Sequence, residues 1–198
     1  MTMRDELLQA MQASDVYPKP PSMASGLLHE LIGRKLEKMV RYSWWPADVA
    51  LAECGIVAEQ AFSLTAGPVA IHFEDGFVLG AASHPSWNSV VVWNEGDTPS
   101  NDKLESDAEF HPITSSGRYA TAFWQRCMNE PVVEVIILKR VKMSAKARAL
   151  PSEVGVRLLF GNGLSFVLSH GLNKPTDDFS ILEEFQLQPD EFSEVAVR

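Results

Sequence analysis

Residues 69–81 read VAIHFEDGFVLGA, and residues 154–168 read VGVRLLFGNGLSFVL. Both stretches alternate apolar and other residues on either side of an Asp-Gly or Asn-Gly pair. This pattern is the strongest short-range signal for a β-hairpin. A further strand is predicted after each hairpin, at 89–93 and 178–182. The sequence therefore predicts an α+β fold built on antiparallel β-hairpins with flanking helices.

The other elements are predicted from helical or alternating spacing of apolar residues. Helices are expected over 2–14, 22–32 and 116–128, and strands over 34–45, 132–138 and 185–187. In the strand 34–45, Leu36, Val40, Tyr42 and Trp44 should share one face. A helix is the alternative, with Leu36, Met39, Val40 and Ser43 on one side. The Ala-rich part of 46–66 favours a helix, while 61–64 fits a strand. Residues 94–112 and 139–149 are expected to be loops.

The two hairpins occur in a matching order of elements, which suggests an internal repeat. Val69 and Val156 are 87 positions apart, as are Ile71 and Leu158, and Ser83-His84 resembles Ser169-His170 with a slip of one residue. We therefore expect one globular domain, 1–198, with an N-terminal helix or arm, 1–21. It would hold two helix-plus-four-strand repeats, 22–93 and 115–187, related by a pseudo-two-fold axis. The alternative is coincidence, because any two hairpins share alternation and an Asx-Gly turn.

Composition places the chain among ordinary globular proteins. Of its 198 residues, 45% are hydrophobic and 22% are charged, and the net charge is −9. No stretch reaches the roughly 20 apolar residues needed to span a bilayer, and the start lacks an apolar signal-peptide core. We expect a cytoplasmic location, no membrane association and no nucleic-acid binding, since the latter needs clustered Lys and Arg. An acidic protein suits a basic partner.

The charge is unevenly distributed along the chain. Residues 95–109 hold six acids and one Lys, and residues 177–198 hold seven acids and one Arg. Residues 139–148, in contrast, hold five bases and no acid. This layout fits an interface with a partner or self-association, and it also fits solvated loops without a specific role.

No motif for catalysis, metal binding or a cofactor is present, so none of the three is predicted. His29-Glu30 begins like a zinc-protease helix, but Gly33 stands where the second His is required. Cys54 and Cys127 are far apart in sequence, and both are expected to be reduced and buried.

Six residues are candidates for an interaction site. Trp45 follows Trp44, and neighbouring residues of a strand face opposite sides, so one of the two indoles should be exposed. Trp87 lies in a turn-like loop, where an indole either binds a partner or folds back on the core. His84 and His170 each follow a hairpin, and the repeat would place them at equivalent corners. Asp177 and Asp178 fit a solvated turn, a cation site or an acid–base pair.

These observations favour a non-catalytic protein-binding module of bacterial type. One specific version is an acidic immunity-type inhibitor that masks a basic toxin. The alternative is a small-ligand-binding protein or enzyme that uses a cleft between the two repeats, lined by His84, His170, Asp177 and Asp178. A third hypothesis is that the chain forms a structural homo-oligomer.

Overall fold

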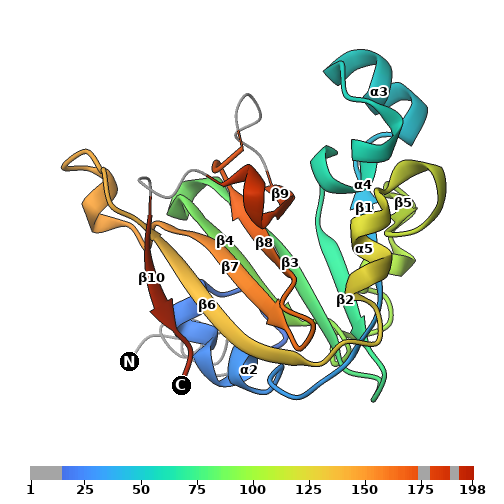
Figure 1. Ribbon diagram of the computed structural model, residues 1–198. Coiled ribbons are helices and arrows are strands. Elements are labelled where there is room, and N and C mark those ends of the chain that lie inside the picture. The colour runs from blue at the N-terminus through green and yellow to red at the C-terminus, as the bar shows by residue number, and fades with distance from the viewer. Residues whose placement is uncertain (1–14, 174–178, 188–191) are drawn as a thin grey trace.

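Two five-stranded antiparallel sheets make up the body of the computed structural model (Figure 1). The structure describes residues 15–173, 179–187 and 192–198. The predicted helix 2–14 and the candidates Asp177 and Asp178 lie outside these residues. The α+β class and the antiparallel hairpins are confirmed.

The first sheet has the strand order β4-β3-β2-β1-β5, and the second has the order β10-β6-β7-β8-β9. The strands of the first sheet are β1 Leu36–Ser43, β2 Val69–Phe73, β3 Val78–His84, β4 Ser89–Asn94 and β5 His111–Thr114. Those of the second are β6 Val132–Arg140, β7 Glu153–Phe160, β8 Ser165–His170, β9 Phe179–Glu183 and β10 Phe192–Ala196. In each sheet four consecutive strands form a meander, and a fifth strand pairs with the first of them.

The helices are short and lie at the margins of the sheets (Figure 1). Within the described residues they are α2 Ser25–His29, α3 Ala47–Cys54, α4 Ala61–Leu64 and α5 Ala122–Cys127. The predicted helix 116–128 is broken, because Gly117 has a φ of 80° and Ala120 is extended. Residues 61–64, which also fitted a strand, are helical.

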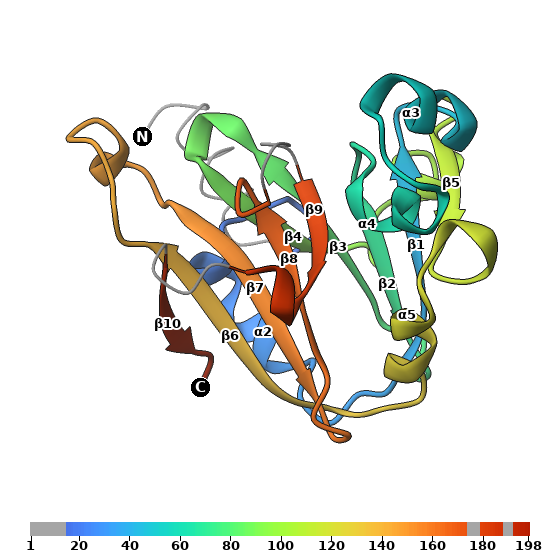
Figure 2. The ribbon, with the colours of Figure 1, turned by 45° about the horizontal axis from the view of Figure 1, so that its top comes forward.

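The main core lies between the two sheets, where β3 and β4 pack against β7 and β8 (Figures 1 and 2). Its members include the alternate apolar residues of both predicted hairpins. These are Val69, Ile71, Phe73, Leu79, Val156, Leu158, Phe160 and Phe166. Trp124 of α5 closes the core beside Phe62 of α4, with ring centroids 5.2 Å apart. Burial of these side chains is the main source of stability.

The alternation of buried and exposed residues predicted for β1 is interrupted after Leu36, the first residue of the strand. The pairing of β1 with β2 shifts register between Leu36 and Lys38. Such a β-bulge adds one residue and exchanges the faces of the strand that follows. Leu36, Met39 and Arg41 are therefore fully buried on one face, and Leu36 does not share the face of Val40, Tyr42 and Trp44.

Three further expectations need correction. The polar segment 94–112 ends in β5, and residues 184–186 form a 3-10 turn, whereas the last strand is β10 at Phe192–Ala196. Each sheet thus has five strands instead of four. Cys54 is exposed at the end of α3, while Cys127 is buried as expected. Burial raises the pKa of the Cys127 thiol to about 12.

Among the described residues, none of the helices combines the length and the apolar character that a membrane crossing needs.

We expect Gly80→Ala to destabilise the protein, because a Cβ at this position would lie 2.1 Å from Cε2 of Trp93. Overpacking of this kind costs about 1–3 kcal/mol. The measurement is urea unfolding followed by circular dichroism. Gly26→Ala in α2 is the matched control, since nothing lies within 4 Å of its Cβ and Ala is the better helix former by about 1 kcal/mol. Equal stability of both variants would contradict the packing described for Trp93.

Candidate functional site

Two neighbouring tryptophans are exposed where β1 ends and α3 begins. Trp44 is 49% and Trp45 58% exposed. The Ser43 hydroxyl accepts from the Trp45 N–H at 3.2 Å and donates to the Trp45 carbonyl at 2.8 Å, and this tight turn directs both indoles outward. The sequence predicted one exposed indole, and the structure has two.

Phe110 completes an aromatic surface with Trp44 and Trp45. Its ring centroid lies 4.5 Å from that of Trp44. The pairing of Ser43 with His111 in β5 brings Phe110 to this place. Because Phe110 and the start of β5 fall within the predicted loop 94–112, the sequence analysis missed Phe110. The three residues are called the aromatic surface from here on.

The segment that leads to Phe110 is acidic and is anchored by one buried carboxylate. Glu95 is 5% exposed and accepts from the Trp93 indole N–H at 2.5 Å and from the Leu104 N–H at 2.8 Å. Asp107 and Glu109 follow, both exposed and one to three positions before Phe110. Two carboxylates therefore lie close to the aromatic surface.

The other neighbour of the aromatic surface, α3, is also acidic. Asp48, Glu53 and Glu59 are exposed in α3 and the turn after it, and no Lys or Arg occurs from position 42 to 102. Arg118 contacts Asp48 at 3.2 Å, but both side chains are well exposed, so this pair is screened by water. The electrostatic field at the aromatic surface should favour a cationic partner.

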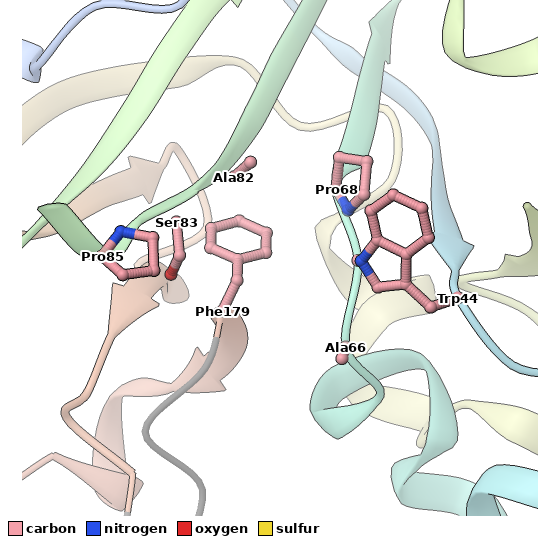
Figure 3. A pocket seen from close by; sticks show the side chains of 8 residues that line it. Trp44, Ala66, Pro68, Ala82, Ser83, Pro85 and Phe179 are labelled. Carbon is pink, nitrogen blue, oxygen red and sulfur yellow. The ribbon is translucent and has the colours of Figure 1, made fainter.

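A pocket of about 390 Å³ lies between the first sheet and the start of β9 (Figure 3). Figure 3 shows Trp44 and Pro68 on one side and Ser83, Pro85 and Phe179 on the other. Its lining residues are Trp44, Ala66, Gly67, Pro68, Ala82, Ser83, Pro85 and Phe179. Trp44 therefore belongs both to the aromatic surface and to the wall of this pocket.

Arg41 lies behind the pocket and holds its walls together. It is fully buried, and its guanidinium donates to the carbonyls of Gly67 at 2.8 Å and Phe179 at 3.1 Å. It also donates to the carbonyls of Phe62 at 3.1 Å and Ser63 at 3.0 Å in α4. Desolvation lowers the pKa of Arg41 to about 9, so the group is still charged at neutral pH.

Of the two predicted histidines, His170 contacts Ser83, while His84 contacts Trp87. The Ser83 hydroxyl lies 2.9 Å from Nδ1 of His170, which is 8% exposed. His84 follows Ser83 at the end of β3, and its ring stacks on Trp87 with centroids 4.2 Å apart. Trp87 is half-buried. Both histidines end strands instead of lying in loops.

The basic segment 139–148 lies at the β6–β7 connection, away from α3 and β5 (Figures 1 and 2). Lys139 pairs with buried Glu153 at 3.1 Å, and Arg140 donates to the Gly171 carbonyl at 3.0 Å. Lys142, Lys146 and Arg148 are exposed. The acidic and basic regions are thus separated on the molecule.

Within the residues that the structure describes, no three His, Cys, Asp or Glu side chains gather closely enough to hold a metal ion. In comparisons with known proteins, no family model matches the chain, and neither a curated protein nor a solved structure matches it.

Replacing Arg41 by Met should lower the free energy of unfolding by about 3 kcal/mol or more, because buried carbonyls of α4, the Gly67 loop and β9 lose their donor. Arg41→Lys should recover little of this loss, since one ammonium cannot reproduce the planar fork of donors. Arg148→Met, at an exposed position, is the control and should change stability by less than about 0.5 kcal/mol. Urea unfolding measures all three, and a tolerated Arg41→Met would contradict this role.

Glu95→Ala should release the acidic segment from the first sheet, because the Trp93 indole and the Leu104 amide lose their shared acceptor. Trypsin cleaves after Lys103, and local opening of this kind accelerates cleavage. We expect cleavage to be at least about tenfold faster, as one lost charged acceptor is worth 1.5–3 kcal/mol. Asp97→Ala is the control, because it removes only an exposed bond to Asn94. Equal cleavage rates in the two variants would rule out Glu95 as the anchor.

Proposed function

We propose that this chain is a cytoplasmic, non-catalytic protein-binding module that uses the aromatic surface and its carboxylates to bind a basic partner. An immunity-type inhibitor that masks a basic toxin of a bacterial competitor is one specific form of this function. The observation that carries the proposal is the contact of Trp44 with Phe110 beside the exposed Asp107 and Glu109. Exposed aromatic side chains with a charged rim are typical of protein interfaces.

Aromatic and charged groups make separate contributions in such an interface. Trp44 and Trp45 offer large apolar areas with few rotatable bonds, so ordering them on binding costs little. The carboxylates speed the encounter with a basic protein and reject acidic ones. The net charge of −9 acts in the same direction at long range.

We also propose that the two sheets are copies of one unit related by a pseudo-two-fold axis. Paired hydrogen bonds where the copies join support this proposal. The Gly33 N–H donates to the Val132 carbonyl at 2.8 Å, and the Asn129 N–H donates to the Leu36 carbonyl at 2.7 Å. Gly33 and Asn129 are 96 positions apart, as are Leu36 and Val132. Two-fold related residues contact each other in this reciprocal way.

The positions of two β-bulges and one side-chain contact between the sheets support the same pseudo-two-fold relation. The register shifts between Leu36 and Lys38 in β1 and between Val132 and Glu134 in β6, again 96 positions apart. Ser83 and His170, which are 87 positions apart, lie in direct contact, as expected for equivalent residues next to an axis. The pocket would then lie beside this axis, in the seam between the copies.

A small-ligand-binding protein or an enzyme that uses this seam is the second candidate function. Its support is the position of Ser83, which lines the pocket and contacts His170. We place it second because the hydroxyl of Ser83 and the indole N–H of Trp44 are the polar side-chain groups among the eight lining residues. Acid–base chemistry usually requires several converging polar groups.

The binding test is selection from a random peptide library displayed on phage, with the full chain as bait. Selected peptides should be richer in Lys and Arg than the starting library, and their affinity should fall as salt rises from about 50 to about 500 mM. Trp45→Ala should weaken the binding of a selected peptide about 30-fold, the typical cost of losing a Trp hot spot.

Phe185→Ala is the matched control, because Phe185 is an aromatic residue that is 80% exposed and lies after β9, outside the aromatic surface. It should leave peptide affinity within twofold or so of the parent value. Selected peptides without excess positive charge, or equal binding by the Trp45→Ala variant, would refute the proposed function.

A further inference from the structure

The pocket between Trp44 and Phe179 opens beside the aromatic surface, so a partner seated on that surface can reach it. Trp44 belongs to both. A pocket next to a flat aromatic surface is where an interface places its anchor side chain. The chemistry of the lining shows which side chain fits.

A full charge of either sign fits this pocket poorly. Its side chains are the rings of Trp44 and Phe179, two prolines, two alanines and the hydroxyl of Ser83. The Ser83 hydroxyl and the Trp44 indole N–H together cannot replace the hydration shell of an ammonium, a guanidinium or a carboxylate. Arg41 adds repulsion against a cation, because its buried charge is bonded to the carbonyls of Gly67 and Phe179, which line the pocket.

A neutral aromatic ring fits it well. Trp44 follows β1 and Phe179 begins β9, and the two stand on opposite sides of the pocket in Figure 3, next to Pro68 and Pro85. Rings of this kind stack on, or meet edge to face with, an entering ring, which adds to the burial of apolar area. The volume of about 390 Å³ is sufficient for one such side chain.

The hydroxyl of Ser83 distinguishes one ring from another. Its contact with Nδ1 of His170 at 2.9 Å holds the Ser83 side chain in one place at the pocket wall. A phenol can exchange a hydrogen bond with this hydroxyl, whereas a phenyl ring would displace water from it without replacement. We propose that the pocket binds a tyrosine side chain of the basic partner, an inference that rests on the proposed function for the identity of the partner.

Titration of the ¹⁵N-labelled chain with p-cresol, the tyrosine side-chain analogue, tests the pocket without the partner. The amides of Gly67, Ala82, Ser83 and Phe179 should shift saturably, with a Kd on the order of 1 mM for so small a ligand. Toluene should bind about fivefold more weakly, because it forms no hydrogen bond. n-Butylamine, the lysine analogue, should produce no saturable shift at these amides.

Two variants separate hydrogen bonding from simple occupancy. Ser83→Ala should remove the preference for p-cresol over toluene and leave toluene affinity unchanged. Ala82→Phe should fill the pocket and abolish the binding of both, while Ala52→Phe, the same change at an exposed position of α3, should have no effect. Absent shifts with p-cresol, equal affinity for toluene, or tighter binding of n-butylamine would each overturn the tyrosine assignment.

Competition distinguishes this inference from the proposed function. Saturating p-cresol should weaken the binding of phage-selected peptides by about tenfold, as expected for the loss of one anchor contact. Peptides that depend on Trp45 and are indifferent to p-cresol would overturn the tyrosine pocket and leave the basic partner standing. Peptides with no dependence on Trp45, together with saturable binding of p-cresol, would overturn the proposed function and leave a phenol site.

Discussion

The buried guanidinium of Arg41 is the interaction on which the arrangement around the pocket depends. From β1 it reaches α4, the Gly67 loop and β9 through four backbone carbonyls, so one side chain ties the first sheet to an edge strand of the second. Ile137, 96 positions later, is 4% exposed. In the proposed repeat, an apolar residue thus occupies the equivalent place, and the cation is a feature of the first copy alone.

Gly67 shows why this arrangement allows little variation. Its φ is 131°, and a Cβ would lie 2.0 Å from the Tyr42 carbonyl oxygen. Only glycine lets the loop come this close to β1, and that approach brings the Gly67 carbonyl within 2.8 Å of Arg41. The loop and the guanidinium therefore hold each other in place. Since Arg41 also binds the Phe179 carbonyl, the Gly67 and Phe179 sides of the pocket are held at a set distance.

The hairpins were predictable because their signals are local, and much of the site was not. Asp75-Gly76 and Asn162-Gly163 set the turns, and alternation set the core faces. Strand β5 contains Pro112 and gains its identity from pairing with β1, which no local pattern reveals. The exposure of the Trp45 indole, in contrast, was predicted from its place beside Trp44 at the end of a strand. The burial of Arg41 on the face of Leu36 was not predictable, because a bulge cannot be read from alternation. The pocket joins segments more than a hundred residues apart.

The position of the pocket has a thermodynamic consequence. Its walls come from the turn after β1, the loop before β2, the end of β3 with Pro85 after it, and the start of β9. The pocket therefore exists only while the two sheets are docked. A ligand that binds there stabilises the docked state by mass action. The hydrogen bonds of Arg41 would also affect the binding of such a ligand, because loosening β9 from α4 would move Phe179 away from Trp44. The stability of the contact between the two sheets and the affinity of the pocket for a ligand should therefore depend on the same hydrogen bonds of Arg41. A change at Arg41 should alter both quantities in the same direction.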